Sequence, residues 1–224
     1  LKQGNIEEYT VVLCTRDYRK IGQLSGIKTE TISVANRFNS ANEISFSLVK
    51  YDLLKPEAKE LLSNEEYEKY ICLRDLLWVQ IIDHKLIWVK ELDEYYEIKV
   101  TINDTQETVK NIHGMSLCEA ELSQYKVTLE INSEADILRD DYEVTTFCNF
   151  ANPSASLLHR AIKDKAPHYK IGHVDESLQK IQRTFSVNEV DIYGFFTGEV
   201  SEQFNCLFQF DSSTRTISAY DLYT

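Results

Sequence analysis

The sequence predicts an α+β fold that is predominantly β, with a small β barrel or sandwich followed by an α+β domain. Three observations predict it. Short segments of alternating polar and apolar side chains recur through the first half of the chain. Glycine and proline are scarce, at 7 and 3 residues, and the two clear helix-start signals stand in the second half. Because the pattern changes at His113 and Gly114, we expect domains over residues 1–112 and 113–224.

The first strands follow from the alternation of side chains. Residues 9–14 are a run rich in β-branched and aromatic side chains. Residues 28–35 and 44–49 alternate along the chain, which is typical of half-buried strands. Residues 36–42 lie between them, and their three asparagines and one serine favour a turn. These two strands are therefore expected to form an antiparallel hairpin.

In the rest of the first domain, the sequence predicts one helix and two further hairpins. Residues 56–62 begin with Pro56, which suits a first helical turn, and residues 64–69 read as a charged connector. The two pairs of strand-like segments are 76–82 with 86–91, around the polar residues 83–85, and 95–103 with 106–113, around Asp104. Many short strands of this kind are typical of a small barrel or sandwich.

The second domain begins with a strand and a capped helix. Residues 123–132 have a strand-like centre, and residues 136–141 are charged and predict a loop. Asn152 is placed to cap a helix that has Pro153 at its first position. The side chains expected on its apolar face are Leu157, Leu158, Ala161 and Ile162.

A second helix and a final hairpin close the chain. Asn188 is placed to cap this helix, and Ile192, Phe196 and Val200 recur at i+4 spacing along one face. Residues 206–210 then alternate, and residues 215–222 are expected to return as their partner strand.

The charge balance restricts the classes of partner. The chain has 24 basic and 36 acidic residues, a formal net charge of −12. Nucleic-acid binding neutralises phosphates with Lys and Arg, so this balance argues against a nucleic-acid-binding surface. It also argues against attraction to anionic lipids. No apolar run approaches the ~20 residues that a membrane helix needs, so we expect no membrane segment.

The cysteines predict buried free thiols. They are odd in number, far apart and never spaced as C-x-x-C, which disfavours both a disulfide framework and a zinc site. The five positions are Cys14, Cys72, Cys118, Cys148 and Cys206.

Two clusters of polar side chains are candidate sites. His168, His173 and Asp175 stand close enough in sequence to suggest a metal site. The residues between the histidines predict a strand and a turn, so we favour surface or hydrogen-bonded histidines. Glu119 and Glu121 are two apart and would share one side of a strand as an acid pair. In a chain with 36 acids, a solvated surface explains them better.

No other pattern indicates chemistry. Asp140 and Asp141 read as a polar loop, because the spaced oxygen ligands and the glycine of a calcium loop are missing. No G-x-S-x-G, H-E-x-x-H or glycine-rich phosphate loop occurs. We therefore predict no catalytic, cofactor-binding or metal-binding residues, no cofactor, and no enzymatic activity in this segment.

Three segments carry a resemblance to a known family. They are NRFNSANEISFSL (residues 36–48), MSLCEAELSQ (115–124) and RTFSVNEVDIYGFFTGEVSEQFNCLFQFDSSTRTISAYDLYT (183–224). Together they resemble the tail-hub proteins of Gram-positive phages and prophages, also named prophage tail proteins, tail-associated lysins or tail endopeptidases. The resemblance covers nearly the whole chain. It rests on the overall sequence pattern and not on a set of catalytic residues.

The resemblance implies an architecture and a role. It implies a tube-type β-barrel domain and an α+β domain like those of a phage baseplate hub, assembled as a homotrimer that closes the tail tube. The implied partners are a distal tail protein and a tape-measure protein, and phage DNA would pass without specific binding. The implied location is the virion, after assembly in the host cytoplasm. Because the family continues beyond Thr224, we expect a truncated second domain, with any lytic activity downstream.

Two other functions stay open. The family names suggest a cell-wall hydrolase (peptidase), which would need a nucleophile–base pair or an open metal site. A carbohydrate-binding module of the tail tip would use aromatic stacking platforms, for which Trp78 and Trp88 are candidates.

Overall fold

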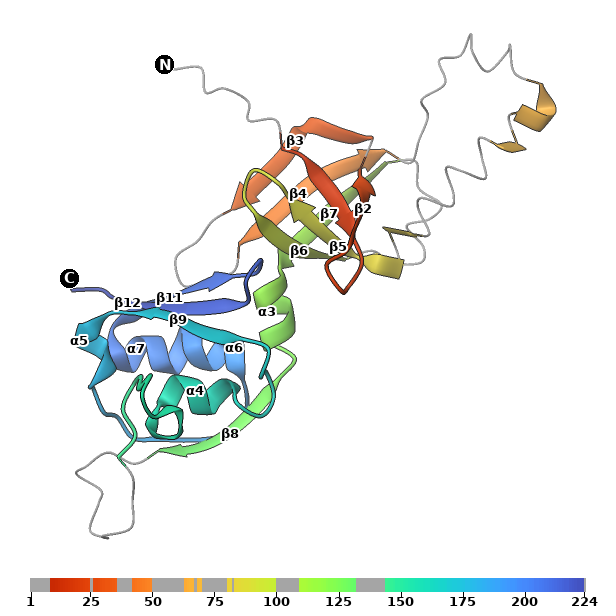
Figure 1. Cartoon of the computed structure of the whole chain (residues 1–224). Helices are drawn as coiled ribbons and strands as arrows, with labels where there is room; N and C mark the ends of the chain where they lie inside the picture. Colours follow the sequence, from red (N-terminus) through yellow and green to blue (C-terminus); the bar gives the residue numbers. More distant parts are fainter. Residues whose placement is uncertain are drawn as a thin grey trace, which may run out of the picture. The chain divides into compact units, whose positions relative to one another are not determined.

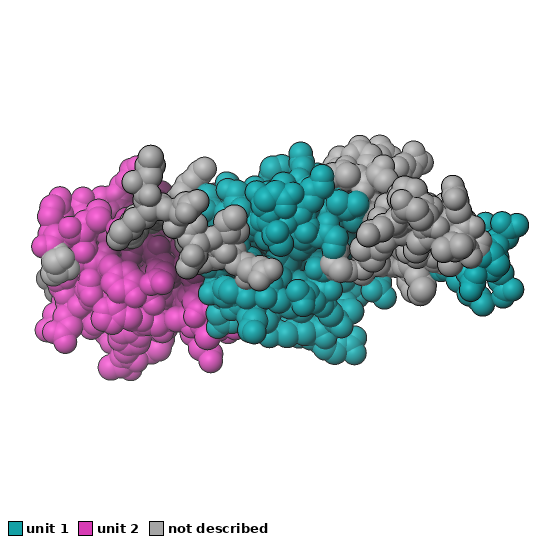
Figure 2. Space-filling model, turned by 90° about the horizontal axis from the view of Figure 1, so that it is seen from above, with its two compact units in different colours: residues 1–35, 42–116 teal, residues 36–41, 117–224 magenta. Residues whose placement is uncertain are grey.

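The computed structural model describes residues 9–24, 26–35, 42–49, 63–66, 68–69, 80–81, 83–99, 109–131 and 144–223. The chain divides into two compact units: unit 1 is residues 1–35 with 42–116, and unit 2 is residues 36–41 with 117–224 (Figure 2). The division follows strand β7 (Val109–Ser116), which a boundary after residue 112 would cut.

Gly114, which the sequence suggested as a break, lies inside β7 because the packing there leaves no room for a side chain. A Cβ atom at Gly114 would lie 2.9 Å from Cγ2 of Ile44 and 3.2 Å from Cγ2 of Ile98. The glycine therefore marks a close approach of strands rather than the end of one.

Unit 1 is built on one antiparallel sheet of seven strands. Their order in space is β2-β1-β5-β6-β7-β4-β3. The bounds of the six strands not yet given are β1 Val11–Cys14, β2 Lys20–Gln23, β3 Ile27–Ala35, β4 Glu43–Val49, β5 Leu86–Val89 and β6 Glu94–Lys99.

The sheet of unit 1 curls into a barrel-like shape (Figure 1). Strands β2 and β3 lie at its opposite edges, yet only residues 24–26 separate them in sequence. Seven flat strands at ~4.8 Å spacing would span about 29 Å. Three linking residues reach only about 14 Å, so the two edges must approach each other. The curled sheet encloses a core that includes Leu13, Phe46, Ile87, Tyr96 and Ile112.

Two predicted strand pairings of unit 1 are confirmed. Strand β3 pairs with β4, and β6 pairs with β7, both antiparallel. Ile44, Phe46 and Leu48 of β4 point into the core, as the alternation predicted. Residues 36–41 of the predicted turn at 36–42, the predicted turn around Asp104 and the predicted helix at 56–62 lie outside the described residues.

The predicted hairpin around residues 83–85 is wrong. Residues 80–81 and 83–84 are helical, and β5 pairs with β1 and β6 instead. The helix ends at Lys85, which has a φ of 55° and donates its N–H to the carbonyl of Ile81 at 3.0 Å.

The prediction of a charged connector at 64–69 is also wrong, because residues 64–66 and 68–69 are helical. Ser63 and Glu66 form a capping box: Oγ of Ser63 accepts from the Glu66 N–H at 3.4 Å, and Oε2 of Glu66 accepts from the Ser63 N–H at 2.9 Å.

Unit 2 contains two sheets with helices between them (Figure 1). Strand β8 (Lys126–Ile131) pairs antiparallel with β10 (Phe185–Asp191). The second sheet is β11 (Cys206–Asp211), β12 (Thr216–Asp221) and β9 (Lys170–Val174), with β9 parallel to β12. The predicted strand within 123–132 and the predicted final hairpin are thus confirmed.

Helices α4, α6 and α7 lie between these sheets (Figure 1), and unit 2 has further helical elements. In chain order the helical elements are α3 Leu117–Leu122, 3₁₀ helix η3 Pro153–Ala155, α4 Leu157–Ile162, α5 Glu176–Gln179, α6 Ile192–Phe195, π-helical η4 Phe196–Val200 and α7 Ser201–Phe204. Stacked phenylalanines dominate the core, with ring centroids 5.1 Å apart in Phe196–Phe208 and 5.9 Å apart in Phe185–Phe204. Every residue of the two predicted apolar helix faces is buried.

Both predicted helix caps are displaced. Asn152 makes no side-chain cap, and Ser156 caps α4 instead, its Oγ accepting from the His159 N–H at 3.4 Å. Asn188 lies in β10, and Asp191 caps α6 by accepting from the Gly194 N–H at 2.7 Å.

Candidate functional site

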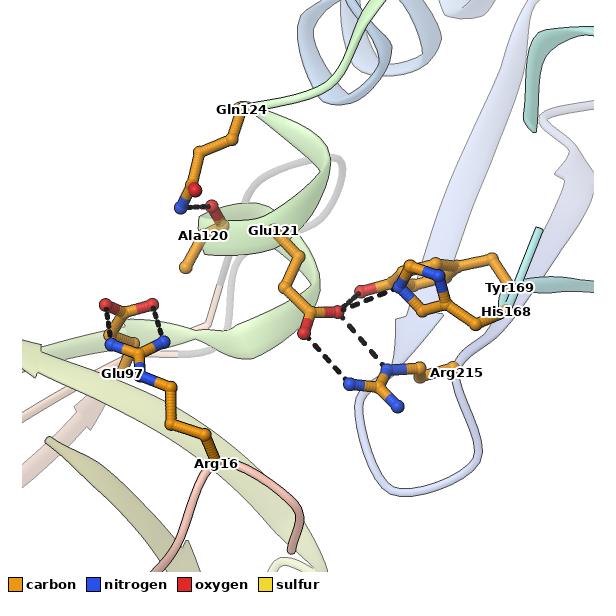
Figure 3. A network of polar contacts seen from close by, with 8 residues as sticks. All are labelled: Arg16, Glu97, Ala120, Glu121, Gln124, His168, Tyr169 and Arg215. Carbon is orange, nitrogen blue, oxygen red and sulfur yellow. Dashed lines mark hydrogen bonds and ion pairs between the residues drawn. The ribbon is translucent and has the colours of Figure 1, made fainter. Parts of the chain in front are cut away.

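A polar cluster of unit 2 is centred on Glu121 (Figure 3). Nη2 and Nε of Arg215 donate to the two Glu121 oxygens at 2.9 and 3.2 Å. The Tyr169 hydroxyl donates to Oε2 at 2.8 Å, and Nε2 of His168 lies 3.6 Å from the same oxygen. The cluster thus joins helix α3, the residues before β9 and the turn between β11 and β12.

Glu121 reaches this position because residues 117–122 form a helix. Leu117, Cys118, Ala120 and Leu122 are buried and fix α3 to its surroundings. Two residues on a helix are about 200° apart, so Glu119 and Glu121 do not share a side. The predicted acid pair on one side of a strand is therefore wrong.

The electrostatics of the Glu121 cluster favour a permanent charge pair. Burial of Glu121 raises its pKa, but the hydrogen bonds from Arg215 and Tyr169 outweigh burial and hold this pKa below its usual value of 4.5. Burial, with Cys118 and Glu121 nearby, raises the pKa of Tyr169. At neutral pH Glu121 is ionised and Tyr169 is protonated. A carboxylate with a lowered pKa and strong donors on both oxygens is a poor general acid or base, and it acts here as a structural clamp.

The structure separates the three residues considered for a metal site. His173 Nε2 lies 2.8 Å from Oδ1 of Asp175, whereas His168 faces Glu121. The other oxygen of Asp175 accepts from the Asp221 N–H at 2.7 Å, a bond that lowers the Asp175 pKa. Within the described ranges, no group of three or more His, Cys, Asp or Glu side chains is placed to hold a metal ion. Asp140 and Asp141 lie outside those ranges.

A cysteine, a serine and a histidine meet at the start of α4, a set that the sequence did not single out. Oγ of Ser156 lies 2.8 Å from Nδ1 of His159 and also contacts Cys148. Burial raises the pKa of Cys148 to about 11, and Ser156 is fully buried. A protonated thiol and an inaccessible hydroxyl are poor nucleophiles, so these residues serve the helix cap.

Trp88 lies in β5 and is half-buried. Nζ of Lys20 lies 3.0 Å from the centroid of the Trp88 ring and covers one face. The indole N–H donates to Asp93 at 2.9 Å. Trp78 lies outside the described residues.

The predicted burial of the cysteines is confirmed for the four that the structure describes, Cys14, Cys118, Cys148 and Cys206. Burial also raises the pKa of Cys206 to about 12. No helix in the described part of the chain is long and apolar enough to cross a membrane.

Comparison with known proteins gives a likeness of fold. No protein-family model matches the chain, and no curated protein matches it. The crystal structure of prophage tail protein gp18 from Listeria monocytogenes EGD-e aligns with 95% of this chain and 50% of its own, at 10% identity and a TM-score of 0.50. The chain therefore spans about half the length of that structure and shares its fold.

A second similar structure is the 43 kDa tail protein of prophage MuSo2 from Shewanella oneidensis. It aligns with 95% of this chain and 55% of its own, at 9% identity and a TM-score of 0.45, which is too low to establish a shared fold. The alignment with gp18 alone confirms, at the level of the fold, the resemblance to prophage tail proteins inferred from the sequence.

Proposed function

We propose that this chain is a structural component of a phage or prophage tail, where it forms part of the tail-tip or baseplate hub. In this role it closes the tail tube and links the distal tail ring to the host-facing tip. The observation that carries the proposal is the alignment of 95% of the chain, and so of both units, with a prophage tail protein.

The surface chemistry supports this role. DNA must slide through a tail without binding, and a net charge of −12 offers few sites for phosphates. The proposed partners are two further copies of the chain, a distal tail protein and a tape-measure protein. The proposed location is the virion, reached by assembly in the host cytoplasm.

The sheet of unit 1 supports assembly through strand edges. Strands β2 and β3 each pair with one neighbour only among the described strands, and all four residues of β2 are exposed. Such an edge presents backbone N–H and C=O groups that a strand of another subunit can pair with. A closed ring of three copies would satisfy these edges by symmetry.

We also propose that this segment is not an enzyme. The Glu121 carboxylate is bound by Arg215 and Tyr169, and the Ser156 hydroxyl is fully buried. Neither arrangement leaves an activated nucleophile accessible to substrate.

The test is the assembly state of the protein with its distal tail protein. We expect light scattering and electron microscopy to show a trimer docked coaxially on the distal tail ring. The protein is used as its gene encodes it, so that every contact it makes to the ring is retained. A full-length protein that stays monomeric and never binds the distal tail protein contradicts the hub assignment.

A further inference from the structure

We propose that the outer face of the unit 1 sheet carries a binding site for a carboxylate group, presented by an acidic side chain of an extended polypeptide. The site is a hollow of about 430 Å³ across strands β3, β4, β7 and β6, which are neighbours in the sheet (Figure 1). We call it the Lys99 hollow. The inference concerns unit 1 alone and does not depend on the proposed role in a phage tail.

Strand pairing places four polar side chains of the hollow in one row. Ser33 lies opposite Ser45, which in turn lies opposite His113. Lys99 lies opposite His113 on its other side. Directly opposed residues point to the same face of a sheet, with Cβ atoms about 4.5–5.5 Å apart. Because Ile44, the residue before Ser45, is buried in the core, the row faces outward.

The row in the hollow differs from the rows on either side of it. Among the described residues, none of its four side chains forms a hydrogen bond or an ion pair. In the row on one side, the Ser47 hydroxyl donates to Oδ1 of Asn111 at 2.8 Å. In the row on the other side, Glu97 is paired with Arg16 at 2.8 Å. The neighbouring rows thus pair polar groups within unit 1, whereas the row in the hollow keeps its groups available to a ligand.

The groups of this row select an anion. The Lys99 ammonium carries a positive charge and can only donate hydrogen bonds. The hydroxyls of Ser33 and Ser45 and a ring N–H of His113 add further donors beside it. Hydrogen bonds from an ammonium to a carboxylate are shorter and stronger than bonds between neutral groups. The row is therefore complementary to a negatively charged group with more than one acceptor oxygen.

The next row distinguishes a carboxylate from a phosphate. Glu43 and Met115 lie opposite each other there and also line the hollow. The charge of Glu43 repels a doubly charged phosphate about twice as strongly as a singly charged carboxylate. Among the described residues that line the hollow, none is an arginine and none belongs to a helix. Arginine forks and helix N-termini are common phosphate-binding groups.

The surroundings of the row favour a carboxylate on a polypeptide. The Met115 side chain is adaptable and apolar, so it can contact the methylene groups of an acidic side chain. Ser33, His113 and Lys99 are exposed, so the hollow is open to solvent. An open site across several strands accommodates an extended segment that continues beyond it on both sides.

The methyl group of Met115 reports on the hollow directly, because Met115 is the single methionine of the sequence. The chain is labelled with ¹³C at the methionine methyl group, and the NMR signal is assigned by its absence from Met115→Leu. We expect a saturable shift on addition of the peptide acetyl-Ala-Asp-Ala-Asp-Ala-amide. The matched peptide with Asn in place of Asp should bind at least about tenfold more weakly. Inorganic phosphate and maltose are tested in the same way and should also bind more weakly than the Asp peptide.

The variants Lys99→Gln and Lys90→Gln locate the binding. Each removes one exposed positive charge of unit 1, but Lys90 lies in the turn between β5 and β6 and does not line the hollow. Lys99→Gln should weaken binding of the Asp peptide at least about tenfold, with the unfolding midpoint unchanged, while Lys90→Gln binds as the wild type does.

Three results would overturn the site. They are an unshifted Met115 signal with the Asp peptide, equal binding of the Asp and Asn peptides, and equal weakening by the two lysine variants, which would indicate a general attraction of charge. Tighter binding of phosphate or of maltose would overturn the carboxylate assignment in favour of that ligand. A chain that binds the Asp peptide but never enters a tail contradicts the proposed function and leaves the hollow supported.

Discussion

Replacing Glu121 with glutamine removes the negative charge of the clamp and keeps its shape. The side chains of Glu121 and Arg215 are only 20% and 26% exposed. Once the Glu121 charge is removed, water therefore solvates the Arg215 charge poorly. One carboxylate oxygen becomes an NH₂ group that cannot accept a hydrogen bond, and the Arg215 charge loses its counter-charge. A hydrogen bond to a charged group contributes about 1.5–3 kcal/mol. We therefore expect Glu121→Gln to lower the free energy of unfolding by about 2–3 kcal/mol.

Glu97→Gln is the matched control for this prediction. Glu97 accepts two bonds from Arg16, at 2.8 and 3.4 Å, but the Arg16 side chain is 56% exposed. An exposed pair of this kind contributes about 0.2–1 kcal/mol. Urea unfolding measures both variants, with the slope of the transition used to check that the mechanism is unchanged. If Glu121→Gln costs no more than Glu97→Gln, the reasoning about the clamp is wrong.

The stability that the Glu121 clamp contributes should also depend on pH, in a direction set by the pKa of Glu121. The pKa of Glu121 in the folded protein lies below its usual value of 4.5, so the clamp stabilises the fold above that pH. As the pH falls through the folded pKa, the carboxylate gains a proton and this stability is lost. The difference between wild type and Glu121→Gln should therefore be full at neutral pH and shrink in acid below 4.5. A difference that grows in acid contradicts the assignment.

Three further predictions concern activity, thiols and packing. The chain should not cleave purified cell wall, and reproducible cleavage abolished by a single substitution would refute this. Mass spectrometry of protein prepared without oxidant should show no disulfide, and the described cysteines should react with thiol reagents only after unfolding, since all four are buried. Gly172→Ala should cost about 1–3 kcal/mol, because its Cβ would collide with Thr216 and lie 2.8 Å from Oγ of Ser218. Gly198→Ala is the control and should not destabilise, since a Cβ there meets nothing within 4 Å.

Period-2 alternation predicted the strands well wherever one face is buried. Strands β4 and β11 were predicted in this way, and both point alternate residues into a core. The same rule failed at residues 117–122, where C-E-A-E-L alternates like a strand. Ala, Glu and Leu are all good helix formers, and the segment folds as α3.

The displaced cap of α6 shows where local sequence is insufficient. Asn188 and Asp191 both precede the apolar face and both are good capping residues. Asn188 instead accepts a hydrogen bond from Thr128 of β8 at 3.1 Å, so strand pairing holds it in β10. Asp191 is then the residue left at the start of the helix. The choice depends on a contact 60 residues away in sequence.

The clamp was not predictable from a single sequence for a similar reason. Glu121 and Arg215 are 94 residues apart, and Glu121 and Tyr169 are 48 apart. Neither separation corresponds to a local motif, and the two glutamates of α3 look equivalent in the sequence. Only the fold brings Arg215, in the turn between β11 and β12, to one of them.

Immunogold electron microscopy of purified particles tests the central claim most directly. An antibody against unit 2 is applied to tails from cells that carry the gene and to tails from cells in which the gene is deleted. If the chain is a structural hub component, the label is confined to the distal end of the tail tube. Deletion of the gene should then leave tails unassembled or without a closed tip. Normal tails in the deletion strain, or particles that never carry the label, contradict the account.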